Sequence, residues 1–295
     1  MGPDKMKSIS VIGLGAVGSA TAIGFAKLGH SVVGVDIIKS KIDKINKLKN
    51  KKLKATLDLE RPILYSDISF ICVETPTNKK GDINLTALKK VCKDIANIIK
   101  NKEYHIIVIR STIFPGSFEI LKMILEKGSG KKCGEDFGVV LNPEFLKEKT
   151  ALEDFLKPSF IVVGANDKKI GKEVMGYYEG IRAKKFIVNE NIAQMIKYVN
   201  NSFHALKVSY TNEIVAICKK ANVDSQKLMG LFCEDTQLNI STYYFKPGKA
   251  YGGRCLPKDL SVLQNKGKQL KVKCPVINSI SESNKIQISR DRKRK

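Results

Sequence analysis

Short apolar runs alternate with longer stretches of helical periodicity from the start of the chain to about residue 190. The apolar runs, which predict buried strands, are Ser8–Ile12, Ser31–Val35, Ile68–Val73, His105–Ile109, Phe137–Leu141, Phe160–Val163 and Lys185–Val188. In Lys39–Lys54 and Leu85–Lys100 the apolar residues recur every three or four positions, which predicts amphipathic helices. Strands that alternate with helices in this way predict an α/β fold with a doubly wound parallel sheet.

After residue 190 the pattern is helical only. An apolar stripe from Ile192 to about Ala221 keeps a period near 3.6 and predicts one helix of roughly 30 residues and 45 Å. Shorter helices are predicted at Asp224–Leu231, Ser261–Lys268 and Val276–Ile288. We therefore predict an α/β domain over residues 1–190 and an all-helical central domain over residues 191–295, whose long helix links domains or forms a homodimer.

Composition narrows the class of protein. The 295 residues are 43% hydrophobic and 27% charged, which suits one large core or two smaller ones. The net charge of +23 favours an anionic partner without identifying it, and scattered lysines without interleaved aromatic residues argue against a specific nucleic-acid interface. No apolar run approaches the roughly 20 residues that span a bilayer, and no signal-peptide pattern is present, so no membrane partner and a cytoplasmic location are expected.

The cysteines do not predict a metal site or a disulfide framework. There are seven, an odd number, with no CxxC pair and no histidine at zinc-ligand spacing. Reduced thiols are the simplest interpretation.

A glycine-rich segment, GLGAVG, joins the first predicted strand to a helix. Gly13, Gly15 and Gly18 stand in the G-x-G-x-x-G register, with Val17 inside the loop, and Asp36 ends the next strand. In this strand, turn, helix and strand context the loop is a dinucleotide fingerprint of the Rossmann type: the first glycine makes the turn, the second admits the pyrophosphate and the third permits close packing. An acidic residue at this position binds ribose hydroxyls, so NAD is favoured over NADP; the alternative is an ordinary glycine-rich turn.

A second glycine-rich segment presents a cysteine. Glycines 252–253 precede Cys255, Arg254 and Lys258 flank it with positive charge, and Pro257 suits the first turn of a helix. Cations and a helix N-terminus favour the nucleophilic thiolate. The alternative is a small buried residue at a tight turn.

Two further pairs of polar residues are candidates for chemistry. Glu144 and Glu148, four residues apart, are either an exposed pair or an acid/base residue and its partner. Lys197 and Asn201 lie at i and i+4 of the long predicted helix and therefore project from one face, where a solvent-facing pair is the alternative. Thr112, by itself, is a helix N-cap candidate.

The string GGRCLPKD, together with the KPG before it, resembles the active-site signature of the UDP-glucose and GDP-mannose 6-dehydrogenase family. The segment LNISTYYFKPG at Leu238–Gly248 is more similar to the GDP-mannose branch. The resemblance implies that the C6 alcohol of a nucleotide sugar is oxidised to a carboxylate with two NAD+, through a thioester on Cys255.

The resemblance also implies roles for other residues. Lys197 and Asn201 would hold the oxyanion, Glu144 would assist thioester hydrolysis, and Asp259 with Thr112 would orient the water. The residues implied to lie at the cofactor are Thr75, Pro76 and Thr112 in the family's VxTPT and STxxPG loops, together with Glu148 and Lys258.

The sequence departs from the family pattern in several places. Arg254 replaces a usual serine, Lys249 a usual phenylalanine and Lys149 a usual glycine. The family's further C-terminal domain, which holds the nucleotide, is expected to be absent. Two alternatives follow: a truncated, non-catalytic NAD-binding homologue that dimerises with a full-length relative, and a hydroxyacid or 6-phosphogluconate-type dehydrogenase, which would not need the cysteine loop.

Overall fold

The computed structural model describes residues 7–220, 222–236, 248–269 and 275–292. The chain divides into two compact units, one of Met1–Pro76 with Asn84–Lys197 and one of Thr77–Ile83 with Tyr198–Lys295. The predicted end of the long helix at Ala221, and the segment Leu238–Gly248 apart from its last residue, lie outside the described residues.

The first unit is built on an eight-stranded sheet in the order β3-β2-β1-β4-β5-β6-β7-β8. Its strands are β1 (Ser8–Ile12), β2 (Ser31–Val35), β3 (Leu53–Thr56), β4 (Ile68–Ile71), β5 (Ile106–Ile109), β6 (Gly138–Leu141), β7 (Phe160–Gly164) and β8 (Lys184–Val188). Neighbours from β3 to β6 are parallel, and only β6 and β7 pair in the antiparallel sense. The first six strands have the order of a Rossmann fold, which confirms the predicted α/β class.

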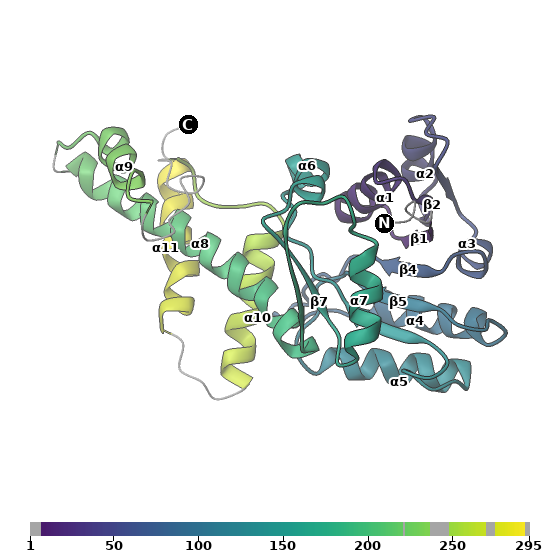
Figure 1. The fold of residues 1–295 in the computed structure, drawn as a ribbon. Helices are drawn as coiled ribbons and strands as arrows, with labels where there is room; N and C mark the ends of the chain where they lie inside the picture. Colours follow the sequence, from purple (N-terminus) through teal and green to yellow (C-terminus); the bar gives the residue numbers. More distant parts are fainter. Residues whose placement is uncertain (1–6, 221, 237–247, 270–274, 293–295) are drawn as a thin grey trace. The chain divides into compact units, whose positions relative to one another are not determined.

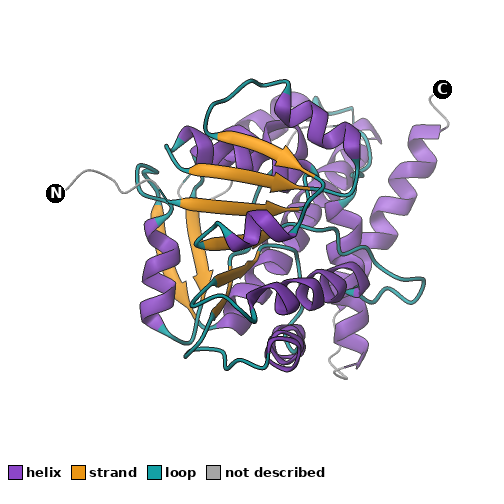
Figure 2. Cartoon of the chain, turned by 90° about the vertical axis from the view of Figure 1, so that its right-hand side faces the viewer, coloured by secondary structure: helices purple, strands orange, loops and turns teal. Residues whose placement is uncertain are grey.

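Helices cover both faces of this sheet (Figure 2). They are α1 (Ala16–Lys27), α2 (Lys39–Asn46), α3 (Glu60–Leu64), α4 (Thr86–Ile99), α5 (Ser117–Ser129), the 3-10 turn η1 (Glu148–Thr150), α6 (Ala151–Leu156) and α7 (Lys168–Gly176). Buried residues of α1, α2, α6 and α7 belong to one core cluster, and those of α3, α4 and α5 to the other. Figure 1 shows α4 and α5 running beside each other.

The two cores arise because side chains alternate along each strand. In β4, Ile68 and Phe70 enter the core that contains α1, whereas Ile71 enters the core that contains α4. A central parallel strand is buried on both faces, so its sequence reads as a continuous apolar run rather than an alternating one. That is why ISFI was recognisable as a strand.

The prediction of one helix over Lys39–Lys54 was wrong. Helix α2 ends at Asn46, Lys49 adopts a positive φ of 49°, and the chain then enters β3. The Asn46 carboxamide donates to the Ala55 carbonyl (3.0 Å) and accepts from the Ala55 amide (2.8 Å), which ties the helix end to the strand. These tertiary bonds override a local lysine-rich pattern that favours continued helix. Strand β3 and helices α3, α5, α6 and α7 were also not predicted.

In the described part of the second unit the regular elements are helices, apart from an isolated bridge between Thr77 and Ile83. Its helices are α8 (Glu190–Lys220), which starts in the first unit, α9 (Ser225–Cys233), α10 (Cys255–Gln269) and α11 (Pro275–Arg292). The 31 residues of α8 confirm the predicted long helix. A small core of Ala205, Tyr251, Leu260 and Ile280 holds α8, α10 and α11 together.

Two searches of the described residues gave negative results. None of the helices described here combines the length and apolarity that crossing a membrane requires. Nor do the described side chains include a cluster of three or more histidine, cysteine, aspartate or glutamate residues able to hold a metal ion.

Candidate active site

The glycine-rich loop leaves no space for side chains at two of its three glycines. Gly13 has a φ of +92°, and a Cβ there would lie 2.9 Å from the carbonyl carbon of Cys72. A Cβ on Gly18 would lie 1.7 Å from the carbonyl oxygen of Gly13. Gly15 differs, because nothing lies within 4 Å of its Cβ position.

Gly15 is also the N-cap of α1 and makes no side-chain cap bond. No side chain caps the first amides of α1, and unpaired amides at the positive end of a helix are an environment that binds phosphate. Val17 lies in the first turn and packs on the core behind the loop. The arrangement fits a dinucleotide pyrophosphate over Gly15.

Asp36 closes this site from the end of β2. Its carboxylate accepts from the amides of Leu14 (2.6 Å) and Ile38 (2.9 Å) and pairs with Lys41 (3.2 Å). Burial by itself raises the pKa of Asp36, but these hydrogen bonds and the Lys41 charge outweigh it and hold the pKa below its ordinary value. A carboxylate fixed as an anion in this place suits ribose hydroxyls.

The loops after β4 and β5 meet at Thr75 and Thr112. The Thr75 hydroxyl is buried and donates to the Thr112 carbonyl at 2.8 Å, while Pro76 is exposed beside it. The structure therefore brings together the two threonines expected near the cofactor. The alternative reading of Thr112 as an N-cap was wrong, because α5 begins at Ser117 with Gly116 as its N-cap.

Glu144 and Lys197 form a buried ion pair within the first unit. Lys197 Nζ lies 2.7 Å from Glu144 Oε1, and the two residues are 4% and 7% exposed. Burial would raise the pKa of Glu144, but the Lys197 charge and hydrogen bond, helped by the Leu146 amide (2.6 Å), lower it below the ordinary value. The carboxylate is thus ionised and available as a base.

The second carboxylate of the loop behaves differently. Glu148 starts the turn η1 and is exposed, four residues after the buried Glu144. The loop geometry therefore separates the two glutamates, one inside the first unit and one at its surface.

In the second unit, Asn201 and Asp259 are partners. Asn201 Nδ2 donates to Asp259 Oδ2, and both side chains are buried at 7% and 1% exposure. Lys258 Nζ lies 3.4 Å from the other carboxylate oxygen of Asp259. Tyr198 is fully buried, and its pKa is raised first by this burial and second by the nearby Asp259 charge. Two predicted site residues from α8 and α10 are thereby joined.

Cys255 is the first residue of α10 and is exposed. Gly253 before it has a φ of +77°, and nothing lies within 4 Å of the Cβ positions of Gly252 or Gly253. The glycine turn thus lets the helix begin at the cysteine, one turn before Asp259. The reading of Cys255 as a buried residue at a tight turn is wrong.

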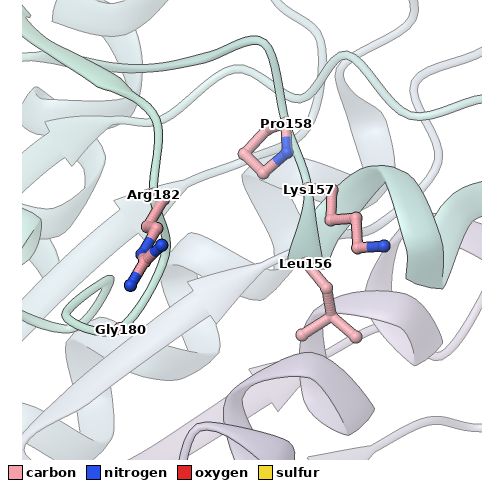
Figure 3. A pocket seen from close by; sticks show the side chains of 5 residues that line it. All are labelled: Leu156, Lys157, Pro158, Gly180 and Arg182. Carbon is pink, nitrogen blue, oxygen red and sulfur yellow. The ribbon is translucent and has the colours of Figure 1, made fainter.

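A separate surface pocket of about 370 Å³ lies in the first unit (Figure 3). Its lining residues are Leu156, Lys157, Pro158, Gly180 and Arg182. None of the predicted site residues lines it, so it is not part of the candidate site.

Sequence reasoning missed several partners of the site residues. Nothing in the sequence, beyond opposite charge, indicated that Lys41 pairs with Asp36. The same is true of the pair of Lys197 with Glu144. Arg110 and Asn142 directly follow two of the predicted strands and were given no role, yet both are buried and hydrogen-bonded to each other. The available signal was a charged residue directly after an apolar strand.

Comparison with known families matches most of the chain to one family. Residues 7–51 and 46–182 match the NAD binding domain of the UDP-glucose/GDP-mannose dehydrogenase family, and residues 191–286 match that family's central domain. The GDP-mannose 6-dehydrogenase of Pseudomonas savastanoi pv. phaseolicola is 42% identical over 95% of this chain and 68% of its own length. A UDP-glucose 6-dehydrogenase of Haloferax volcanii is 32% identical over 86% of this chain and 64% of its own length.

Solved structures show the same relationship. A UDP-glucose dehydrogenase from Pyrobaculum islandicum matches with a TM-score of 0.89 and 31% identity, over 97% of this chain and 70% of that one. A ternary complex of GDP-mannose dehydrogenase from Pseudomonas aeruginosa matches with a TM-score of 0.77 and 40% identity, over 95% of this chain and 69% of that one.

Proposed function

Because this chain belongs to the UDP-glucose/GDP-mannose dehydrogenase family, we propose that it oxidises the C6 alcohol of a nucleotide sugar to the uronate through a thioester on Cys255. The family's cofactor is NAD, and the glycine-rich loop and Asp36 have the geometry to hold it. GDP-mannose is the proposed substrate, since GDP-mannose 6-dehydrogenases reach 42% identity and the UDP-glucose 6-dehydrogenase of Haloferax volcanii 32%.

The observation that carries the proposal is the position of Cys255. It is exposed at the first residue of α10, where the helix N-terminus and the neighbouring Arg254 and Lys258 favour the thiolate over the thiol. A thiolate can capture the C6 aldehyde as a thiohemiacetal and keep it bound until the second oxidation. Bound NAD+ supplies the chemistry of hydride acceptance in each of the two oxidations.

Charge and hydrogen bonding support the remaining proposed roles. The Lys197 ammonium and the Asn201 carboxamide would stabilise the oxyanion of the thiohemiacetal and of the tetrahedral intermediate during hydrolysis. Glu144, kept ionised by Lys197, would take a proton from the attacking water, and the Cys255 thiolate would then leave. Asp259, with Thr112, would orient that water. Per sugar, the balance is one water consumed, two NADH formed and three protons released.

The test is a turnover assay on the purified chain. GDP-mannose and UDP-glucose are each incubated with NAD+, and NADH is followed by absorbance while the sugar product is identified by mass spectrometry. Two NADH per uronate support the proposal. NAD binding without NADH from either sugar would contradict it and favour the non-catalytic alternative that partners a full-length relative.

Cys255→Ser is the first decisive variant. We expect it to bind NAD with the affinity of the wild type and to lose uronate formation by at least about 10³-fold, because a serine hydroxyl is not ionised at neutral pH. Cys133→Ser, a substitution at a half-buried thiol of the other unit, is the matched control and should retain turnover. Normal turnover in Cys255→Ser would contradict the proposed thioester mechanism.

We further propose that the chain acts as a cytoplasmic homodimer through α8. Three of its large apolar side chains, Ile192, Val199 and Phe203, are 58%, 49% and 50% exposed and lie at spacings of seven and four residues. Those spacings place them on one helical face. Exposed apolar side chains that share one helical face are typical of a protein interface.

A further inference from the structure

Arg110 is a buried arginine that no proposed catalytic step uses. It directly follows β5 and is 5% exposed. Its Nε donates to Thr21 Oγ1 at 3.0 Å, and its Nη1 donates to Tyr178 Oη at 3.2 Å and to both the side-chain and main-chain oxygens of Asn142. Within the described part of the chain, no carboxylate is hydrogen-bonded or ion-paired to this guanidinium.

These contacts join three elements of the first unit. Thr21 lies on α1, the helix that begins at the glycine-rich loop, and Asn142 follows β6 two residues before Glu144. Tyr178 follows α7, and its hydroxyl also donates to Asn142 Oδ1 at 2.5 Å. A guanidinium has five donors in fixed directions, so it can hold these partners at once, which an ammonium on a flexible stem cannot.

The charge of Arg110 acts on Glu144. Burial raises the pKa of the neighbouring Cys72 thiol and of the Tyr178 hydroxyl to about 12 in each case, so both are neutral at physiological pH. The ionised group that remains is Glu144: burial raises its pKa, Lys197 is the largest opposing influence, and Arg110 lowers it further. Two cations therefore lower the pKa of this carboxylate: Lys197 on α8, which contacts it, and Arg110 at the end of β5.

We propose that Arg110 is a positioning residue: its guanidinium fixes the turn from Asn142 to Glu144 against the helix of the glycine-rich loop. The base and the dinucleotide site are then held by one rigid set of hydrogen bonds. The catalytic part of this inference rests on the proposed function, whereas the positioning itself does not. Asn142 Nδ2 also donates to the Val162 carbonyl at 2.7 Å, which anchors the turn to β7.

Arg110→Lys tests the positioning because it keeps the positive charge but loses the planar guanidinium and its fixed donor directions. We expect an unchanged dissociation constant for NAD+ and an unchanged KM for the sugar, with kcat reduced roughly 10- to 100-fold, since a small misplacement of a reacting group costs about this much. Arg182→Lys, at an exposed arginine of the same unit, is the matched control and should behave as the wild type. An Arg110→Lys enzyme with wild-type kcat would overturn the proposal.

A second readout needs no turnover. Hydrogen exchange of the Leu146 amide, which is bonded to Glu144 Oε2, should become faster in Arg110→Lys and in Tyr178→Phe but not in Arg182→Lys. Unchanged exchange at this amide in Arg110→Lys would overturn the proposal even if the chain has no activity on any sugar. Faster exchange in an inactive chain would support the positioning while contradicting the proposed function.

The electrostatic part is measured on Arg110→Met. The infrared band of the protonated Glu144 carboxyl, isolated by subtracting the spectrum of the same protein carrying Glu144→Gln, is followed against pH. Its midpoint should rise by roughly 0.5–1 pH unit in Arg110→Met, a three- to tenfold change in ionisation constant, and stay in place in Arg110→Lys. If Arg110→Met folds and its Glu144 midpoint is unshifted, the electrostatic role is contradicted. If Arg110→Met does not fold, the test is Arg110→Lys, which keeps the charge: a shifted Glu144 midpoint in that variant contradicts the role.

Discussion

At the scale of single residues, the environment of Glu144 decides what its carboxylate can do. An isolated carboxyl in an apolar interior takes up a proton, but Lys197 and the Leu146 amide reverse that tendency. The result is a carboxylate that is buried and yet ionised, so it is in the proton-accepting form at neutral pH. Glu148, exposed on η1, lacks this environment.

Glu144→Gln should separate the oxidations from the hydrolysis. We expect a rapid burst of NADH followed by turnover slowed about 10²–10⁴-fold, because a carboxamide cannot accept the proton from water. Mass spectrometry of the quenched protein should show the sugar bound to Cys255. Glu153→Gln, an exposed glutamate on α6, is the matched control; a Glu144→Gln protein that hydrolyses its thioester at the normal rate would exclude this role.

The same carboxylate sets a pH dependence. Its lowered pKa means that Glu144 stays ionised from neutral pH to below the ordinary carboxyl range near pH 4 and gains a proton only under more acidic conditions. Its contribution to stability is therefore complete above the unfolded-state value and is lost as the pH falls through the lowered folded-state value.

Removal of its partner should be costly. Lys197→Met leaves a buried carboxylate without its counter-ion, so we expect the free energy of unfolding to fall by about 3–5 kcal/mol at pH 7, measured by urea titration. The double variant Lys197→Met with Glu144→Gln should recover most of this loss. A double variant as unstable as Lys197→Met would show that packing, rather than charge, dominates the site.

At the scale of elements, α1 and its glycine turn combine two separate requirements. Gly18 is required by packing, since any Cβ would collide with the Gly13 carbonyl, whereas Gly15 faces open space. One motif therefore contains a glycine needed for the fold and a glycine needed for the ligand.

A matched pair of alanine variants should separate the glycine needed for the fold from the glycine needed for the ligand. Gly18→Ala is expected to destabilise the first unit by roughly 1–3 kcal/mol and to weaken NAD binding, because the overpacked turn must shift. Gly15→Ala should leave the melting temperature unchanged but weaken NAD binding by an order of magnitude or more, since its methyl group would occupy the path of the pyrophosphate. Calorimetric unfolding measures the stability of each variant, and NAD titration measures its affinity. A Gly15→Ala protein with wild-type NAD affinity would show that the pyrophosphate does not bind over Gly15.

At the scale of the whole molecule, the exposed apolar side chains of α8 bear on how the chain assembles. If its exposed apolar face is a dimer interface, Phe203→Glu should shift the mass in sedimentation equilibrium from two chains to one, because a buried unpaired carboxylate opposes association. Phe186→Glu, at a phenylalanine on β8 that is 46% exposed, is the matched control and should leave the mass unchanged. Two chains in Phe203→Glu would locate the interface elsewhere.

Much of this protein was determined by local sequence alone. All strands of the sheet except β3, the glycine turn, the acidic end of β2 and the long helix α8 were predicted because hydrophobic period and glycine spacing are local properties. The same holds for Cys255 at the start of its helix, where glycines and proline define the turn. The boundary of α2 was not predictable, because bonds from Asn46 to a strand nine residues away decided it.

Only the tertiary structure decided which charged groups meet. The pairs of Glu144 with Lys197 and of Asn201 with Asp259 join residues 53 and 58 positions apart, and the Arg110 cluster joins α1 to the ends of β5 and β6. Whether a carboxylate is ionised depends on its partners and its burial, and neither can be read from neighbours in the chain. The sequence thus determined most of the elements and the candidate residues, while folding determined the electrostatic state of those residues.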